Sequence, residues 1–317
     1  MSKKSMAARR QMQMSAAETR AGAGSARRQG RNYRRDARSR RPWGIIGAVV
    51  AVVAAFVIVI IFAENSFNQG LNQDAKVSAA PASLVQALEG IPPARVHSVG
   101  LGSVTNPPLK IPASYKAEAL SSHGVPQVLY VGAEYCPYCA TLRWALIVSL
   151  SQFGHFANLH TVRSSVYETG EANIPTFSFA YGAQYTSPYI DFDAREIQSN
   201  VSLHHDGAPY ATLQSLNSTE SKAFSGLDPQ EYYPFVDFGG KVLSVASPWS
   251  SVSALSGLSW NQVLHQLHNP KSTIAQAVFG SANYITAAVC TMDGGTPTKV
   301  CSNATIQSLM AKIQASQ

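Results

Sequence analysis

Two different patterns of apolar residues follow one another in the middle of the chain. The short run Val128-Leu129-Tyr130-Val131 is apolar and β-prone, which indicates a buried strand. From Cys136 to about Phe153, apolar residues return at spacings of three and four, which is typical of a helix, and Gly154 is expected to end it. The sequence therefore predicts a strand that leads directly into a helix.

Other segments show the same two patterns. The clearest is a hairpin in which Pro234 precedes two β-prone runs, 235–238 and 241–245, joined by Gly239-Gly240. Further strands are predicted at 96–101, 159–162, 176–181 and 185–192, and helices at 83–88, roughly 258–289 and 303–315, with 195–227 more polar and helical in parts. This order predicts a mixed sheet flanked by helices, an α/β fold.

A long apolar segment lies nearer the N-terminus. Residues 44–63 contain no charged residue, and a helix of that length spans roughly 30 Å, the thickness of a bilayer core. A cleaved signal peptide is disfavoured, because the region before the segment is too long and the apolar run exceeds the usual length. We therefore expect a single transmembrane helix at 43–63, with Trp43 at the membrane interface.

Charge is distributed unevenly around this segment. Residues 1–41 contain 13 Lys and Arg but only Glu18 and Asp36 as acids, whereas the rest of the chain has a net charge of −4. The basic balance belongs to the tail and is not by itself a sign of nucleic-acid binding. The positive-inside rule predicts a cytoplasmic N-terminus. The expected organisation is a disordered Arg-rich tail at 1–42, the membrane span, a polar linker at 64–83 and an extracytoplasmic domain at 84–317.

Two cysteines begin the predicted helix. The run Cys136-Pro137-Tyr138-Cys139 places two thiols at a helix N-terminus, where the helix dipole and free N–H groups favour thiolate over thiol. Such a pair supports thiol–disulfide exchange, in which one thiolate attacks a partner's disulfide and the second resolves the mixed disulfide. We expect Cys136 to attack, because it lies nearer solvent, and Cys139 to resolve. On the outer side of a membrane such disulfides persist.

These residues carry a resemblance to known families. The tetrapeptide is identical to the dithiol glutaredoxin motif, and the order of elements around it resembles a thioredoxin fold with a helical or β insertion. The wider context is distantly similar to the Dsb-type disulfide oxidoreductases of bacterial envelopes. The runs 132–140 and 143–146 look most like an uncharacterised, membrane-anchored thioredoxin-like family of actinobacteria and archaea, over about residues 84–310. That resemblance implies a fold but no established activity.

The resemblance also implies a cis-proline beside the dithiol, which leaves a backbone edge free to pair with the substrate. Two positions compete for this role. The run Ile174-Pro175-Thr176 copies the thioredoxin tripeptide and follows Cys139 at a similar spacing. Pro234 has the better downstream hairpin and is favoured, although cis bonds are rare enough to leave both positions open.

The chain departs from the thioredoxin pattern in the strand before the dithiol. Thioredoxins keep a buried acid there that accepts a proton from the second cysteine, and residues 127–131 contain none. Two charged residues lie nearby: Arg143 could favour thiolate, whereas Glu134 could oppose it or shuttle protons. Both could equally be surface charges, which is the favoured interpretation for Glu134. The missing acid favours an oxidase or isomerase over an efficient reductant. Aromatic residues are expected to shape and cover the dithiol, namely Tyr135, Tyr138 and Trp144.

The second cysteine pair suggests a different role. Cys290 and Cys301 flank a turn with Asp293-Gly294-Gly295, which favours a structural disulfide that staples a loop; a relay with the first pair is the alternative. A zinc site would need further Cys or His ligands at tight spacing. The histidine pairs His204-His205 and His265/His268 have no acidic or Cys partners nearby. We therefore expect no metal and no cofactor.

These features together predict an enzyme, a membrane-anchored, extracytoplasmic thiol–disulfide oxidoreductase acting on protein thiols. Its expected partners are extracytoplasmic proteins with thiols or disulfides and the lipid bilayer, with a membrane redox partner as an open candidate and no nucleic acid. Two alternatives stay open. One is a non-enzymatic binding or scaffold domain whose first cysteine pair is a staple. The other is a redox sensor that transmits thiol state to the Arg-rich tail.

Overall fold

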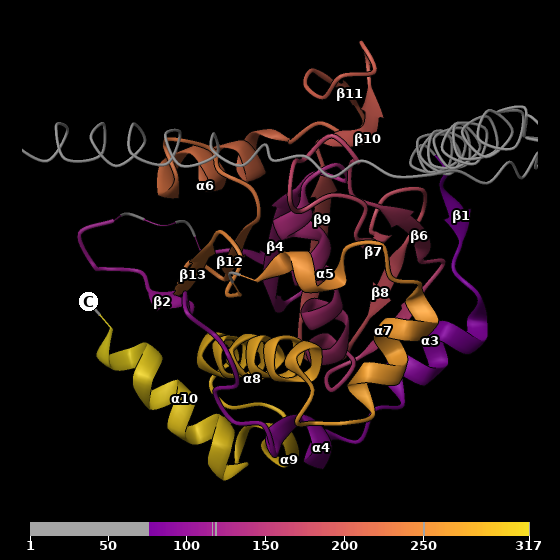
Figure 1. The fold of residues 1–317 in the computed structure, drawn as a ribbon. Helices are drawn as coiled ribbons and strands as arrows, with labels where there is room; N and C mark the ends of the chain where they lie inside the picture. Colours follow the sequence, from indigo (N-terminus) through magenta and orange to yellow (C-terminus); the bar gives the residue numbers. More distant parts are fainter. Residues whose placement is uncertain (1–75, 116, 118, 250, 317) are drawn as a thin grey trace, which may run out of the picture. The chain divides into compact units, whose positions relative to one another are not determined.

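The computed structural model describes residues 76–115, 117, 119–249 and 251–316 (Figure 1). The predicted tail at 1–42, the predicted membrane span at 43–63 and most of the predicted linker lie outside these residues, so they stay predictions. Within the described ranges, no helix combines the length and the apolar character needed to cross a membrane.

The centre of the described part is a mixed sheet built around β4 (Val125–Gly132). On one side β4 pairs in parallel with β9 (Asp191–Glu196); on the other it pairs antiparallel with β12 (Phe235–Phe238). Beyond β12 follow β13 (Val242–Val245) and β2 (Leu109–Lys110), while the short β3 (Ser121–Ser122) pairs with the start of β4. The sheet order is therefore β2-β13-β12-β4-β9.

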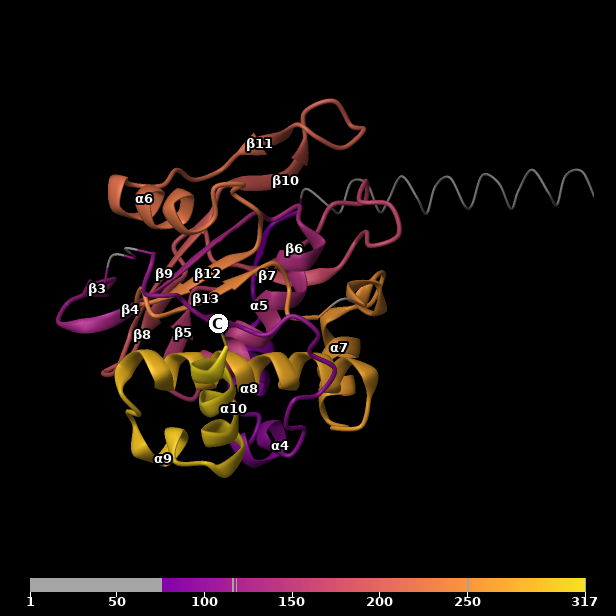
Figure 2. The same cartoon turned by 90° about the vertical axis from the view of Figure 1, so that its left-hand side faces the viewer.

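Helices cover both faces of this sheet (Figure 2). Side chains alternate between the faces along β4, as they do in any strand. Val128 and Tyr130 join the large core formed with α5 (Pro137–Leu150) and α8 (Thr273–Asp293), whereas Leu129 and Val131 pack in a smaller core with α6 (Ser218–Leu227). The strand that precedes the dithiol is thus buried on both faces, which explains its continuous apolar run.

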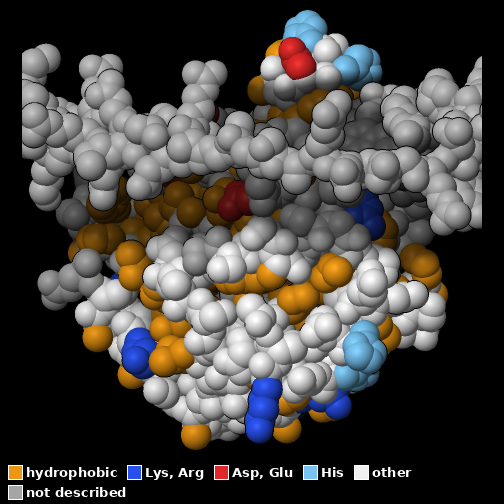
Figure 3. Space-filling view, viewed as in Figure 1, with side chains coloured by type: hydrophobic (Ala, Val, Ile, Leu, Met, Phe, Trp, Pro, Cys, Tyr) orange, Lys and Arg blue, Asp and Glu red, His pale blue; other side chains and the backbone are white. Residues whose placement is uncertain are grey.

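Smaller elements complete the fold. A second sheet has the order β1-β6-β7, and two separate two-stranded sheets pair β5 with β8 and β10 with β11. The bounds of these strands are β1 Ser78–Ala79, β5 His155–Ala157, β6 His160–Arg163, β7 Pro175–Ser178, β8 Gln184–Thr186, β10 Gln198–Ser202 and β11 Tyr210–Thr212. The remaining helices are α3 Ala82–Glu89, α4 Pro93–His97, α7 Trp260–Leu267, α9 Thr298–Cys301, α10 Ala304–Ala315 and the 3₁₀ turn η1 Val252–Leu255. The β10–β11 hairpin projects from the body of the domain, and Figure 3 shows histidine and acidic side chains at its tip.

The structure confirms the α/β prediction, including the strand before the cysteines and the Gly-Gly hairpin. Three local predictions are wrong. The segment 185–192 is not one strand: β8 ends at Thr186, β9 begins at Asp191, and the two strands belong to different sheets. The segment 96–101 is not a strand: α4 occupies its start, because Pro92-Pro93 opens a helix with a proline at its first position. The linker was predicted to extend to residue 83, but β1 pairs with β6 and α3 begins at Ala82, so residues 78–83 belong to the domain. The insertion at 195–227 holds β10 and β11 as well as α6.

Candidate functional site

The two cysteines of the first pair lie at the start of α5, the helix that follows β4. Cys136 is the N-cap residue of α5, and its Sγ accepts a hydrogen bond from the backbone N–H of Cys139 at 3.1 Å. Pro137 takes the first helical position, where its missing N–H costs no hydrogen bond. Both cysteines are free thiols; Cys136 is 5% exposed and Cys139 is 0% exposed. Only the first is therefore within reach of a partner.

Aromatic side chains surround the pair. Tyr135 and Tyr233 pack against the cluster formed by the two cysteines and Ala133. The ring of Tyr135 stacks on the ring of Tyr210 with centroids 4.1 Å apart, which ties the β10–β11 hairpin to the dithiol. No local pattern predicts the contacts of Tyr210 and Tyr233, because both residues are distant from the motif along the chain.

The other two aromatic residues named from the sequence do not pack in this cluster. Tyr138 is 37% exposed, and its hydroxyl donates to Glu171 Oε1 at 3.0 Å. Trp144 is fully buried on another side of α5, where its ring lies edge-on to Phe177 of β7. Trp144 therefore supports the helix that carries the cysteines rather than covering them.

The two candidate prolines differ in their environment. The Tyr233–Pro234 peptide bond is cis, and Tyr233 is the residue that packs against the cysteines. Within the part of the chain that the structure describes, neither the backbone N–H nor the C=O of Tyr233 has a hydrogen-bond partner. Pro175 is the first residue of β7, and its C=O accepts a hydrogen bond from the indole of Trp144 at 2.8 Å. Pro234 thus follows an unpaired piece of backbone beside the dithiol, and Pro175 does not.

A buried ion pair lies beneath the cysteines. Arg143 of α5 is 0% exposed; its Nε and Nη2 donate to Oε1 and Oε2 of Glu196 at 2.8 and 2.5 Å, and Nη2 also donates to the C=O of Ala133 at 2.7 Å. Arg143 is therefore not a surface charge. Glu196 ends β9, which pairs in parallel with β4, and the sequence did not reveal it as part of the site.

Glu134 is buried too, which contradicts its interpretation as a surface residue. Its side chain is 0% exposed, Oε2 accepts a hydrogen bond from the Tyr181 hydroxyl at 3.3 Å, and Oε1 has no partner among the described residues. Burial, with a smaller contribution from the negative charge of Glu196, raises the pKa of Glu134 to about 7. The carboxyl group is thus poised to gain or lose a proton near neutral pH.

Tyr130 places a hydroxyl group close to the second cysteine. A Cβ added at Gly132 would stand 2.2 Å from Tyr130 Oη and 3.2 Å from Cys139 Sγ, so the two atoms flank the space that this glycine leaves open. The hydroxyl is buried and has no hydrogen-bond partner in the described ranges. Burial raises the pKa of Tyr130 well above its ordinary value, so the phenol keeps its proton.

The environment of Cys136 differs from the sequence-based expectation. The N–H of Cys139 and the charge of Arg143 lower its pKa, as the helix N-terminus and the nearby arginine predict. Burial, followed by the neighbouring Cys139 side chain, outweighs both, and the pKa of Cys136 lies well above its ordinary value. The prediction of a thiolate favoured by the helix start was therefore wrong about which effect is larger.

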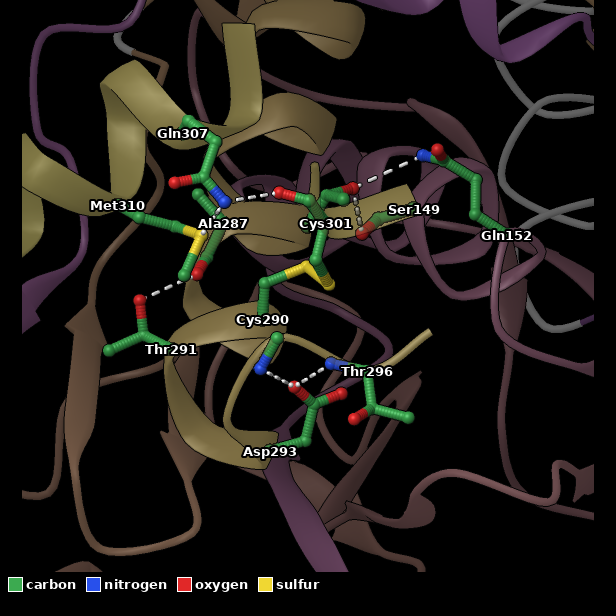
Figure 4. Close-up of a disulfide and its surroundings, with 12 residues drawn as sticks. Ser149, Gln152, Ala287, Cys290, Thr291, Asp293, Thr296, Cys301, Gln307 and Met310 are labelled. Atoms are coloured by element: carbon green, nitrogen blue, oxygen red, sulfur yellow. Dashed lines mark hydrogen bonds between the residues drawn. A yellow bond between two sulfur atoms is a disulfide. The ribbon is translucent and has the colours of Figure 1, made fainter. Parts of the chain in front are cut away.

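The second cysteine pair forms a disulfide at the end of α8 (Figure 4). Cys290 and Cys301 have Cα atoms 5.6 Å apart and are almost fully buried. Asp293 organises the turn between them, since its Oδ1 accepts from the N–H groups of Gly295 and Thr296 at 2.9 and 3.0 Å. These contacts give the bridge the surroundings of a structural staple.

Metal binding finds no geometric support in the described ranges, where no group of three or more His, Cys, Asp or Glu side chains is placed to hold an ion. The site is therefore defined by a dithiol, the aromatic residues around it and a buried set of ionisable side chains. These features belong to a mixed α/β domain in which the first cysteine pair is free.

Part of the chain matches a protein-family model. Residues 112–223 are similar to a family described as a domain of unknown function, DUF929. The matched range contains the dithiol, Glu134, Arg143 and Glu196, and it ends before Tyr233. Neither the curated proteins nor the solved structures contain a match to this chain.

Proposed function

We propose that residues from about 78 onward form a thioredoxin-like domain that exchanges disulfide bonds with partner proteins, and that a transmembrane helix at 43–63 holds it on the outer side of a membrane. The observation that carries the proposal is the free cysteine pair at the start of α5, in which Cys136 Sγ accepts the N–H of Cys139. A bond between these sulfurs could form and break without moving the helix.

The surrounding fold supports the thioredoxin-like assignment. A central strand leads into the helix that begins with the dithiol, and a hairpin, β12–β13, follows the cis Tyr233–Pro234 bond. The helix α8 comes after the hairpin and packs with α5. The unpaired backbone of Tyr233 offers one donor and one acceptor to an extended partner segment beside Cys136, in the way that the resemblance implies for the family's cis-proline.

The proposed reaction has two steps. The Cys136 thiolate attacks one sulfur of a partner's disulfide; that S–S bond breaks, and the other partner sulfur leaves as a thiolate and takes up a proton. Cys139 then loses its proton and attacks Cys136 Sγ, which releases the second partner sulfur, also as a thiolate that is protonated. The partner gains two electrons and two protons, and the pair becomes a disulfide. The same steps in reverse oxidise a partner dithiol.

Burial of the attacking cysteine bears on the direction of electron flow. A strong oxidase has a high reduction potential because its reduced form is stabilised as a thiolate. Burial raises the pKa of Cys136 and works against that stabilisation. Of the two activities favoured by the sequence, exchange of the isomerase type therefore fits this site better than strong oxidation.

A trapping experiment tests the proposal. In the full-length chain, Cys139→Ser leaves Cys136 able to attack but unable to be released, so mixed disulfides with partners should accumulate on non-reducing gels. Cys136→Ser in the same chain is the matched control and should trap nothing. A membrane-impermeant maleimide added to intact, mildly reduced cells should label Cys136 in the Cys139→Ser variant if the domain faces outward. Absence of any mixed disulfide, with a Cys136–Cys139 bond that resists reduction, would refute the exchange activity.

Near-complete burial of both cysteines favours a second candidate, a non-enzymatic binding domain in which the pair is a staple. The reduction potential of the pair separates the two candidates. A staple should be very reducing and react slowly with added thiols, whereas an exchanging pair should equilibrate with glutathione. In a staple, Cys136 should also react with alkylating reagents only when the domain unfolds.

A further inference from the structure

Three segments border the dithiol, and each is held there by a contact with it or with the residue before it. The first is the loop between β6 and β7, where the N–H of Ser165 donates to the C=O of Tyr135 at 2.9 Å. The second is the β10–β11 hairpin, whose Tyr210 stacks on the ring of the same Tyr135. The third is the segment between α6 and β12, whose Tyr233 packs against the cysteines. A partner that reaches Cys136 must pass beside these segments.

The acidic and basic residues of these three segments are unevenly distributed. Their acids are Glu168 and Glu171 in the loop, Asp206 at the tip of the hairpin, and Asp228 and Glu231 before β12. None of the three segments contains a Lys or an Arg. The guanidinium of Arg143, which lies beneath the cysteines, is paired with Glu196. The surroundings of the dithiol therefore carry a negative charge.

Two of these carboxylates are fixed at the border of the site by tyrosine hydroxyls. Tyr138, inside the cysteine motif, donates to Glu171 Oε1 at 3.0 Å, and Tyr210 donates to Glu168 Oε1 at 3.0 Å. Both glutamates are partly exposed, and in the described part of the chain the Oε2 atom of each has no partner. Each carboxylate can therefore accept a hydrogen bond from a group that a partner brings to the dithiol.

We infer that this site exchanges disulfides preferentially with cationic partners, namely protein segments that carry Lys or Arg beside the reacting cysteine, and reacts slowly with anionic thiols and disulfides. The inference rests on the proposed exchange activity and names its substrate class. Opposite charges raise the rate of encounter, and a Lys or Arg side chain can form charge-assisted hydrogen bonds with Glu168 and Glu171. The positive charge of the partner also favours the Cys136 thiolate, which burial disfavours.

Three small disulfides of similar size and different charge test this preference. Cystamine is a dication, bis(2-hydroxyethyl) disulfide is neutral, and dithiodiglycolate is a dianion. Each is mixed with the reduced full-length protein in nanodiscs of zwitterionic lipid, the reaction is stopped with acid, and the remaining thiols are counted by alkylation and mass spectrometry. Each rate is divided by the rate at which the same disulfide reacts with dithiothreitol, because the leaving thiols differ in their own reactivity.

The normalised rates should decrease from the dication to the neutral disulfide to the dianion. At low ionic strength the rate with cystamine should exceed the rate with dithiodiglycolate by about tenfold or more. Added salt should bring the two rates together, since at 0.1 M ionic strength charges on the surface are screened beyond about 10 Å.

Substitution by Gln tests the two glutamates. Glu168→Gln and Glu171→Gln each remove a charge and keep an oxygen that can accept from the tyrosine hydroxyl. The double variant should lower the ratio of the cystamine rate to the dithiodiglycolate rate severalfold. Its unchanged rate with the neutral disulfide would show that the dithiol is intact. Asp191→Asn is the matched control, because it removes a carboxylate beside Gln127, at the end of β4 remote from the dithiol, and should keep the wild-type ratio.

The outcomes separate this inference from the proposed function. If none of the three disulfides oxidises the pair, exchange is absent and the proposed function fails. If all three react at equal normalised rates with the wild type, exchange stands and the preference for cationic partners is refuted. A wild-type ratio in the double Gln variant would refute the role of Glu168 and Glu171.

Discussion

The buried carboxyl of Glu134 makes a quantitative prediction about stability and pH. In the unfolded chain the ordinary pKa of this group is 4.5, and in the folded protein burial raises it to about 7. The folded state thus binds the proton more tightly than the unfolded state. Its contribution to stability is fully present below pH 4.5 and is lost as the pH rises through 7.

The magnitude follows from the two pKa values. A tenfold change in proton affinity corresponds to about 1.4 kcal/mol, so raising the pKa from 4.5 to about 7 removes about 3 kcal/mol of stability between acid and mildly alkaline pH. Glu134→Gln replaces the carboxyl with an uncharged group of the same shape. The variant should therefore gain stability relative to the wild type by about 3 kcal/mol as the pH rises from 4.5 to 8.

Urea denaturation of the reduced protein at several pH values measures this gain. Asp193 and Asp237 also have pKa values raised by burial, to about 6, so the wild-type curve falls for more than one reason. The difference between the wild-type and Glu134→Gln curves isolates the one carboxyl. If the two curves stay parallel from pH 4.5 to 8, Glu134 is not buried in the folded protein, and the assignment of its pKa is refuted.

Three further predictions concern the rest of the site. Replacing both Cys290 and Cys301 by Ser opens a loop with a sequence separation of 11 and should lower the free energy of unfolding by about 3 kcal/mol, while the equilibration of the first cysteine pair with glutathione stays as in the wild type; a change in that equilibration would instead indicate a relay. Arg143→Met leaves the carboxylate of Glu196 buried without its partner and should lower the free energy of unfolding by about 3–5 kcal/mol. The double variant with Glu196→Met should lose less, and urea denaturation of the two variants and the wild type would show the difference. Tyr233→Ala removes a ring that packs against the dithiol and should raise the rate of iodoacetamide labelling at the attacking cysteine severalfold, whereas an unchanged rate would mean that this ring does not limit access.

The sequence patterns were sufficient to predict the elements that are encoded by a few neighbouring residues. The run before Cys136, the helix after it and the Gly239-Gly240 hairpin are each encoded in a few neighbouring residues, and all three are present. The segment 96–101 was wrongly predicted as a strand, because its apolar residues have no clear period. A proline pair just before it starts a helix instead.

The ionisable part of the site could not be predicted in the same way. Glu134 stands two residues before Cys136, a position that looks exposed when only its neighbours are considered. Its burial results from packing with β9 and with the segment after β7, which bring Glu196 and Tyr181 to it from far along the chain. No local pattern carries that information, since parallel pairing of β4 with β9 is decided by the whole sheet.

The burial of Cys136 and Glu134 favours a site in which the sulfur of Cys136 is neutral rather than charged. Negative charge is disfavoured at Cys136 and at Glu134, while the buried cation Arg143 is paired with Glu196. Cys136 is therefore held as a thiol in the reduced pair, and a disulfide at this position would be neutral, so neither oxidation state is favoured through a charge trapped on Cys136. A helix N-terminus by itself would have predicted a thiolate and a strongly oxidising pair. In the proposed exchange, a partner would have to supply part of the polarity that ionises Cys136, because desolvation outweighs the helix end. The unpaired backbone of Tyr233, whose ring packs against the dithiol, is the group that we propose a partner segment pairs with.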